Sequence, residues 1–312
     1  MADIYVGVTD RAWYQHLRSL PTLDEVNFWH PKGGSFRSLP SGGLFLFKLK
    51  YPDNAIVGGG FFVHHSVWPL SSAWEAFGEK NGAATIEEMI DRLSRLNREL
   101  RAQDLAGRMS HPIGCTLLTQ PFFFRESEWF TPPSWKPNIQ EGMGYQLAAA
   151  DGDQLMQLVQ ERLLGGQGTE LILDPSLPPR YGAPILVQPR LGQGAFRLMV
   201  GDAYHRRCAV TRDRVWPALE AAHIVPYVEG GPHEVANGLL LRRDLHRLFD
   251  LGYMSVTPDL KLDVSTRIKD EFHNGRAYYE FAGIELEPPQ LAVDRPDVDA
   301  ILWHRRHWGF AA

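Results

Sequence analysis

Three side chains within residues 207–252 have types and spacing suited to catalysis or metal binding: His223, His246 and Asp250. His223 lies at the end of an apolar, β-branched run that closes on Pro226. Because proline cannot continue a ladder of backbone hydrogen bonds, this pattern predicts a short strand that passes into a loop. His223 is therefore expected where a strand meets a loop.

The spacing predicts a helix over residues 243–251, where apolar side chains recur every three or four positions and a glycine follows. His246 and Asp250 then lie one turn apart on another face of that helix. An imidazole and a carboxylate in this arrangement can chelate one divalent cation, and His223 can accept a proton from a nearby water. The stretch indicates a strand, a loop and a helix around a metal.

Asn237 precedes the apolar run Leu239–Leu241, and its amide can hold a loop or an imidazole in place. The set His223, Asn237 and His246, with AAHIVP before it and LHRLFDLG after it, resembles the HNH (ββα-metal) nuclease family. Within that family it is most similar to bacterial modification-dependent and other restriction endonucleases. The resemblance covers roughly residues 200–260 and implies that His223 is the general base, Asn237 the middle residue of the signature and His246 a metal ligand.

The chain departs from the wider family at Ala222, where many members carry an acidic metal ligand. Asp250 is the expected second ligand, and Glu220 is the nearest replacement for the third, because on a strand it points to the same side as position 222. In the structural alternative, the histidines are core residues and the His246/Asp250 pair is a solvated helix face.

The net charge of −5 does not indicate a nucleic-acid-binding protein, yet 25 of the 32 basic residues are arginine. Several of them lie close to the motif in sequence, and the planar guanidinium suits phosphate. We therefore expect Arg206, Arg207 and Arg243 to contact DNA phosphates. The alternative is a coding bias that favours arginine throughout the chain.

The N-terminal half predicts an α+β domain. Strands are expected over residues 4–8, 43–50 and 56–63, and a capping box at Thr85 and Glu88 opens a helix over residues 85–102. The triple glycine 58–60 suggests a bulge or a close approach to the backbone. The aromatic and glycine-rich residues 28–37 are expected to form a loop, and the strands a small β-barrel.

The order of these elements, with LPSGGLFLFKLK and NAIVGGGFF, resembles the PUA-like superfamily that includes the EVE, ASCH and SRA domains. The resemblance implies a pocket for a modified base, modified cytosine being the kind expected, because an extruded base must be sandwiched by flat apolar groups. The candidate rings are Phe28, Trp29, Phe36, Trp68 and Trp74. Alternatively, each ring fills the barrel core.

Glycine and proline interrupt the periodicity after residue 165, which predicts domains over residues 1–165 and 185–312 joined by a linker at 166–184. The two cysteines form no CxxC pair, and neither a signal peptide nor a membrane-spanning run is visible, so a cytoplasmic protein is expected. The fold class is α+β, a PUA-like barrel plus an HNH domain.

The two resemblances together imply a modification-dependent DNA endonuclease that uses Mg²⁺ or Mn²⁺. Cutting both strands requires a homodimer or two successive nicks. One alternative is a nucleic-acid reader with an inefficient HNH fold, and another is an HNH nuclease that is insensitive to modification.

Overall fold

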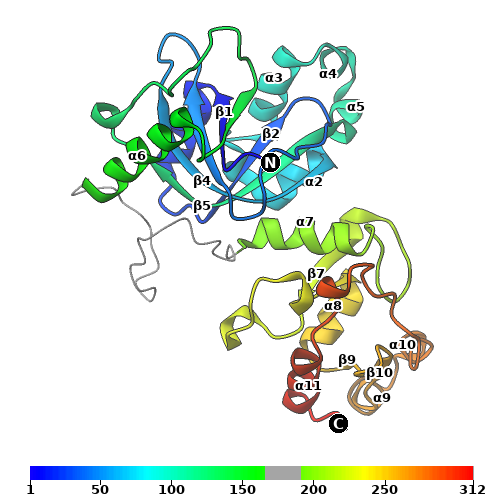
Figure 1. The fold of residues 1–312 in the computed structure, drawn as a ribbon. Helices are drawn as coiled ribbons and strands as arrows, with labels where there is room; N and C mark the ends of the chain where they lie inside the picture. Colours follow the sequence, from blue (N-terminus) through cyan, green and yellow to red (C-terminus); the bar gives the residue numbers. More distant parts are fainter. Residues whose placement is uncertain (166–190, 312) are drawn as a thin grey trace. The chain divides into compact units, whose positions relative to one another are not determined.

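The computed structural model describes residues 1–165 and 191–311, and the chain divides into two compact units, Met1–Pro189 and Arg190–Ala312 (Figure 1). We call them the sheet unit and the hairpin unit. The predicted linker, residues 166–184, lies outside the described residues. In the part that the structure describes, no helix is long and apolar enough to cross a membrane.

The sheet unit contains a six-stranded mixed sheet in the order β2-β5-β4-β3-β1-β6, in which β1 pairs with β3 in parallel and the other pairs are antiparallel. Among the described residues, the edge strands β2 and β6 do not pair with each other. The strands are β1 Ile4–Thr9, β2 Glu25–His30, β3 Leu44–Leu49, β4 Ile56–Pro69, β5 Pro112–Phe123 and β6 Gly142–Tyr145.

Helices cover both faces of this sheet, because successive apolar side chains of β3 point to opposite faces. Phe45 and Phe47 pack with α1, whereas Leu44 and Leu46 face the opposite core, to which α6 contributes. A strand buried on both faces needs apolar residues at successive positions. The helices are α1 Arg11–Ser19, α2 Leu70–Phe77, η1 Gly78–Asn81, α3 Ile86–Leu96, α4 Arg98–Ala102, α5 Leu105–Ser110, η2 Glu126–Glu128 and α6 Ala150–Gly165.

The predicted glycine bulge is confirmed in β4. The register with β5 shifts between Gly59 and Phe61, and a Cβ on Gly58 would lie 2.2 Å from the carbonyl oxygen of Phe122. A side chain at position 58 would therefore displace the neighbouring strand.

Two expected elements differ from the structure. Residues 28–30 are not loop but the end of β2, because they pair with Thr116–Gly114 of β5. The helix expected over 85–102 is broken at Asn97, whose extended backbone ends α3 and whose side chain accepts hydrogen bonds from the backbone of Glu99 and Leu100 to begin α4. The α+β class is confirmed.

The hairpin unit is built on an antiparallel pair, β7 Leu219–His223 and β8 Gly238–Arg242, followed directly by α8 Arg243–Asp250. The helix before the motif is α7 Gln193–Ala203, and it packs against this hairpin through Phe196 and Val200. The predicted ββα arrangement is therefore present.

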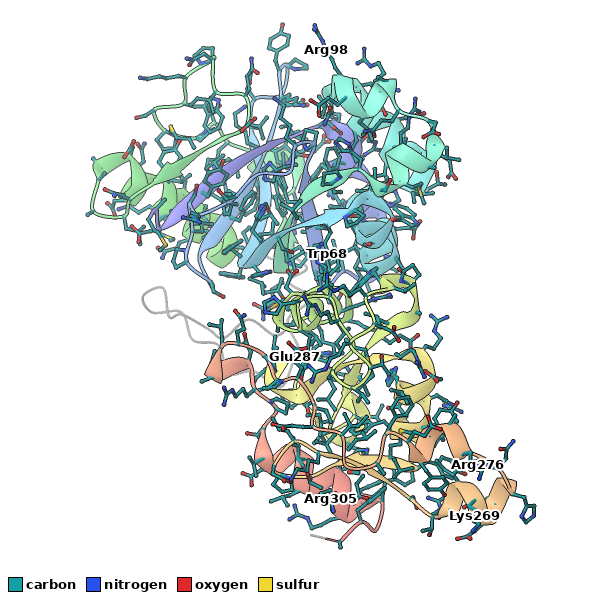
Figure 2. All side chains as sticks on the ribbon, turned by 90° about the vertical axis from the view of Figure 1, so that its right-hand side faces the viewer. Trp68, Arg98, Lys269, Arg276, Glu287 and Arg305 are labelled. Carbon is teal, nitrogen blue, oxygen red and sulfur yellow. The ribbon has the colours of Figure 1, made fainter. Side chains whose placement is uncertain are left out.

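The remainder of the hairpin unit surrounds this motif. Arg305, which is labelled in Figure 2, is buried on α11, and its ion pair with Asp263 ties α11 to β10. The remaining elements are η3 Trp216–Ala218, η4 Tyr227–Glu229, η5 Val235–Asn237, β9 Met254–Val256, β10 Leu262–Val264, α9 Arg267–Phe272, α10 Arg276–Tyr279, η6 Ala292–Asp294 and α11 Val298–His307.

Candidate functional site

The β-hairpin and α8 bring the predicted motif residues together in the hairpin unit. His223 is the last residue of β7, paired with Gly238 at the start of β8, and α8 carries His246 and Asp250 one turn apart. Leu245 and Phe249 bury the opposite face of α8 in the core. This burial fixes the direction in which the polar face points.

His246 is held between two carboxylates. Its Nδ1 lies 2.8 Å from Oε2 of Glu220, and its Nε2 lies 3.2 Å from Oδ2 of Asp250. Burial of the ring disfavours its charge, but Asp250 and then Glu220 outweigh burial and raise the pKa of His246. The other oxygen of Glu220 accepts a hydrogen bond from Nε of Arg243 at 2.7 Å.

The contacts of His246 can be compared with the expected metal site, in which His246, Asp250 and Glu220 were the three ligands. Glu220 and Asp250 contact different nitrogens of one ring, and within the described ranges no three His, Cys, Asp or Glu side chains are arranged to hold a metal ion. Ala222 is fully buried in the core, so no acid can be accommodated there without burying its charge. Glu220 contacts Nδ1 of His246 in this structure, and its expected role as a direct ligand stays a prediction.

The donors present nevertheless fit a divalent cation held by two protein groups. Mg²⁺ commonly keeps several waters and binds one or two carboxylates together with substrate phosphate. A metal-binding imidazole usually donates its other N–H to a carboxylate. His246 Nε2 and Asp250 match the ligand pair, and Glu220 matches the orienting carboxylate.

His223 lies in an aromatic environment. Its ring stacks on Phe196, with ring centroids 4.0 Å apart and an interplanar angle of 12°, and its Nε2 is 3.0 Å from Nδ1 of His233. Burial, followed by the nearby His233 and His246, lowers the pKa of His223 to about 4. The ring is therefore neutral at pH 7 and can accept a proton.

Asn237 holds the loop that follows His223. Its Oδ1 accepts a hydrogen bond from the backbone N–H of Val225, and its Nδ2 donates to the carbonyl oxygens of Val225 and Pro232, all at 2.9 Å. Its side chain is buried. Two roles were expected for the amide, holding a loop or holding an imidazole, and these hydrogen bonds match the first.

The three expected phosphate-binding arginines have different surroundings. Arg243 is exposed beside Glu220 at the start of α8, within the motif. Arg206 pairs with Asp202, and Arg207 has a buried Nε without a hydrogen-bond partner, both just after α7. Arg243 thus contacts a residue of the motif, Glu220.

Sequence reasoning missed His233 and Phe196. The motif pattern names neither residue, because their contacts with His223 are formed by a loop and by a helix that precedes the hairpin. His233 could have been noticed in the sequence as a histidine in the short segment GGPHEVAN, which lies between His223 and the end of the loop at Asn237.

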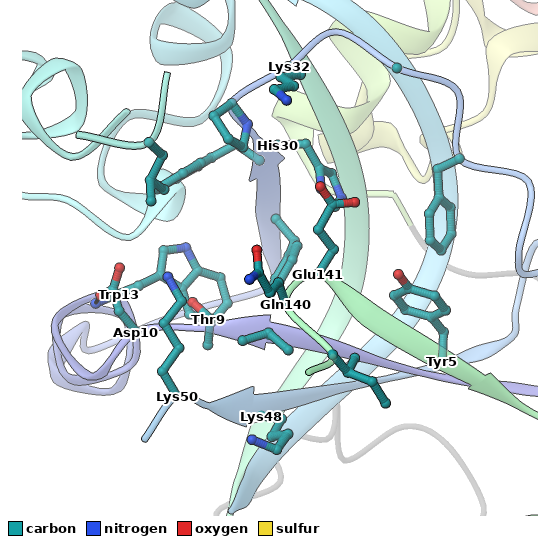
Figure 3. A pocket seen from close by; sticks show the side chains of 18 of the residues that line it. Tyr5, Thr9, Asp10, Trp13, His30, Lys32, Lys48, Lys50, Gln140 and Glu141 are labelled. Atoms are coloured by element: carbon teal, nitrogen blue, oxygen red, sulfur yellow. Dashed lines mark hydrogen bonds between the residues drawn. The ribbon is translucent and has the colours of Figure 1, made fainter. Parts of the chain in front are cut away.

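A second candidate site is a cavity of about 1010 Å³ in the sheet unit (Figure 3). Its lining combines rings with charged and polar groups. Burial and then the charge of Glu141 raise the pKa of Tyr5, and burial lowers the pKa of Lys48. Lining residues include Tyr5, Thr9, Asp10, Trp13, Phe28, Trp29, His30, Lys32, Phe36, Lys48, Lys50, Trp135, Gln140 and Glu141.

His30 presents a buried nitrogen in this cavity. Its Nε2 is buried and has no hydrogen-bond partner, and burial followed by the nearby His65 lowers the pKa of His30 to about 4. His65 is already engaged, because its Nε2 lies 2.6 Å from the carbonyl oxygen of Gly34 and its Nδ1 is 2.9 Å from the hydroxyl of Thr116. A neutral His30 can donate a hydrogen bond or accept one.

The expected pocket rings fall into two groups. Phe28, Trp29 and Phe36 line the cavity, although Phe28 also belongs to the core and Trp29 donates its indole N–H to the carbonyl oxygen of Asn81. Trp68 and Trp74 are not among the described residues that line it. Trp68 is buried at the end of β4, where its Nε1 donates to Ser66, and Trp74 lies on α2.

Comparison with known proteins identifies the hairpin unit. Residues 208–257 match the family model of HNH endonucleases, so the chain carries an HNH endonuclease domain and the predicted resemblance is confirmed. No curated protein matches the chain.

Solved structures with distant similarity include two mutant forms of the ASCH protein of Zymomonas mobilis. Each is 10% identical, and they cover 51% of this chain and 97% and 98% of their own, with TM-scores of 0.32 and 0.33. A modification-dependent restriction endonuclease, TagI, is 14% identical, covering 97% of this chain and 80% of its own with a TM-score of 0.29.

Proposed function

We propose that the protein is a metal-dependent DNA endonuclease that cuts after sensing a modified base. One observation carries the nuclease half of this proposal: the segment that matches the HNH endonucleases places a neutral His223 at the strand end and His246 with Asp250 on the following helix. Together these groups supply a proton acceptor and a cation-binding pair.

The chemistry assigned to His223 is general-base catalysis of phosphodiester hydrolysis. A water loses a proton to the imidazole, its oxygen forms a bond to phosphorus, and the bond from phosphorus to the 3′-oxygen breaks. That oxygen takes a proton from solvent, which leaves a 5′-phosphate and a 3′-hydroxyl. Arg243, exposed beside Glu220, is placed to contact the DNA backbone.

Mg²⁺ or Mn²⁺ is the proposed cofactor, held by His246 Nε2 and Asp250. When bound, such a cation neutralises charge that develops on the phosphate and on the leaving oxygen. Glu220 holds the opposite edge of the His246 ring, and this contact directs Nε2 toward Asp250.

The cavity of the sheet unit is the proposed sensor of a modified base, with modified cytosine the first candidate. The buried, unpartnered Nε2 of His30 supports this assignment, because an enclosed polar atom without a partner is costly unless a ligand satisfies it. Phe36 and Trp29 offer flat surfaces for stacking, and Lys32 and Lys50 line the same cavity.

Binding by the full-length His223→Ala protein, which should not cut, tests the sensor. Fluorescence anisotropy should show tighter binding to duplexes with methylcytosine or hydroxymethylcytosine than to plain duplexes. His30→Ala should reduce that preference about two- to tenfold, the value of one hydrogen bond. His16→Ala is the matched control, because Nε2 of His16 is also buried and unpartnered but does not line the cavity. Equal affinity for all three duplexes would remove cytosine-modification sensing.

A nucleic-acid reader without efficient cleavage is the second candidate. Ala222, at the position of an acidic ligand in many HNH proteins, favours it, as does the lack of a three-residue metal cluster among the described residues. Incubating modified and plain plasmids with the protein and Mg²⁺ or Mn²⁺ separates the candidates. A reader cuts neither plasmid, and a nuclease insensitive to modification cuts both equally.

A further inference from the structure

His233 is the polar side chain that contacts the imidazole of His223. The two rings meet nearly edge to face, with an interplanar angle of 77°, and Nε2 of His223 lies 3.0 Å from Nδ1 of His233. Phe196 covers a face of the His223 ring, and Tyr227 packs on His233 with ring centroids 4.5 Å apart. His223 is therefore held by a hydrogen bond at one edge and a ring against one face.

We propose that His233 is a positioning residue that fixes the tautomer of His223, accepting at its Nδ1 the proton that His223 carries on Nε2. This inference rests on the proposed nuclease function, because it assigns His233 a task in the same reaction. His233 itself neither touches DNA nor takes up the proton of the attacking water in this assignment.

The chemical reason lies in the two nitrogens of a neutral imidazole, of which one donates and the other accepts. If the Nε2–H of His223 is committed to His233, the lone pair is on Nδ1, and Nδ1 is the atom that takes the proton from water. Without His233 the ring can adopt the other tautomer, which offers the water an N–H in place of a lone pair. The nitrogen engaged by a neighbouring group decides which tautomer a histidine adopts.

The loop places His233 through contacts already described. Asn237 donates to the carbonyl oxygen of Pro232, the residue directly before His233, and to that of Val225, two residues after His223. One buried amide thus spans the short segment between the two histidines. The rings are consequently fixed relative to each other by backbone as well as by their own contact.

The first test compares substitutions of His233 in DNA nicking by the full-length protein. An asparagine oxygen can occupy the place of Nδ1 and accept from His223, whereas glutamine carries its oxygen one bond further along the chain. His233→Ala and His233→Gln should lower kcat roughly 10- to 100-fold with KM unchanged, as for other groups that orient a functional imidazole. His233→Asn should restore most of the loss. Glu234→Ala, an exposed neighbour in the same loop, should match wild type.

The second test reads the tautomer without relying on activity or on a variant's folding. Long-range ¹H–¹⁵N correlation spectra of wild-type protein labelled in histidine, with the His223 signals assigned by their loss in His223→Ala, should show the proton on Nε2. A proton on Nδ1 would overturn the proposal. So would wild-type cleavage rates in His233→Ala. A wild-type protein that cuts no DNA would instead overturn the nuclease function, even where the spectra show the Nε2–H tautomer.

Discussion

At the scale of single residues, the site depends on two histidines held in opposite electrostatic states. Burial keeps His223 neutral, whereas two carboxylates favour a charged His246 in the absence of a cation. A neutral ring accepts a proton, and a ring flanked by carboxylates exchanges its proton for a metal ion. We propose that these different surroundings give the same side chain different roles at the two positions.

Replacement of the helix-face pair should weaken cation binding. His246→Ala and Asp250→Ala each remove a proposed ligand, so activity should fall and be partly recovered at high Mn²⁺ concentration. Glu220→Gln, which alters the group on Nδ1, should reduce affinity roughly 10- to 100-fold while leaving both ligands in place. Titration calorimetry with Mn²⁺ measures these affinities. Unchanged affinity in both His246→Ala and Asp250→Ala would refute the pair as the cation site.

At the scale of elements, the hairpin and α8 matter because they place residues far apart in sequence at one site. Pro226 and the apolar run before it were sufficient to predict the strand end at His223, and the i, i+3, i+4 pattern predicted α8. The contact with His233 could not be predicted in this way. It depends on a loop conformation set by three hydrogen bonds of Asn237 rather than by local periodicity.

The same distinction explains the errors in the sheet unit. Residues 28–30 look irregular beside glycine and proline, but β5 offers them a full set of pairing partners. The break at Asn97 is invisible to periodicity, because the apolar pattern continues through it. Trp68 and Trp74 carry rings of the kind that stack on a base. Their position in the fold, which the sequence pattern does not give, leaves them outside the described lining of the cavity.

Asn237→Ala should loosen the loop that follows His223. It leaves the N–H of Val225 and two carbonyl groups, which all take part in part-buried hydrogen bonds, without their partner, and a fully buried unsatisfied group costs about 1–3 kcal/mol. We expect a loss of unfolding free energy in that range, a lower nicking rate and a smaller change in Mn²⁺ affinity than in the ligand variants. Urea denaturation measures the free energy, a nicking assay measures the rate, and titration calorimetry measures the Mn²⁺ affinity. A variant with wild-type stability and rate would show that the loop is held by other contacts.

At the scale of the whole molecule, each unit has its own hydrophobic core. Residues 1–165 alone should therefore fold and bind modified duplexes in preference to plain ones, and residues from about 185 onward should cut weakly without that preference. Gel shifts and nicking assays on the two fragments test this division. Modification preference in the C-terminal fragment would move the sensor to the hairpin unit.

The cavity ring best suited to that test is Phe36. Stacking of a base on an aromatic ring contributes on the order of 1–3 kcal/mol of binding free energy. Phe36→Ala should therefore weaken binding of modified duplexes roughly five- to hundred-fold. Trp29→Ala should also lower the melting temperature, because the indole of Trp29 is bonded to Asn81. A fall in melting temperature for Phe36→Ala without a change in affinity would make this ring a core residue.

Acid should destabilise the protein through its buried histidines. Burial lowers the pKa of His304 to about 4, and His304 is bonded to the hydroxyl of Ser255 and close to the carbonyl oxygen of Phe249. Between that value and about 6.5 the unfolded chain binds more protons than the folded chain. The stabilisation is therefore complete above pH 6.5 and is lost as the pH falls toward 4.

Urea unfolding at pH 7.5 and pH 5 measures this loss. We expect a decrease on the order of 2 kcal/mol from His304, with further contributions from His30 and His223, whose pKa values are also lowered to about 4. In His304→Gln the decrease should be smaller than in wild type. Equal decreases in the two proteins would show that His304 does not titrate in this range.

Cleavage of matched plasmids by wild type and by His223→Ala tests the central claim most directly. The plasmids share one sequence and carry either plain cytosine or hydroxymethylcytosine, and each is incubated with Mg²⁺ or Mn²⁺. Wild type should cut the modified plasmid faster, and His223→Ala should lose about 10²- to 10⁴-fold in rate while binding DNA and melting as wild type does. Cleavage by His223→Ala at more than about a hundredth of the wild-type rate would contradict the role of His223 as general base.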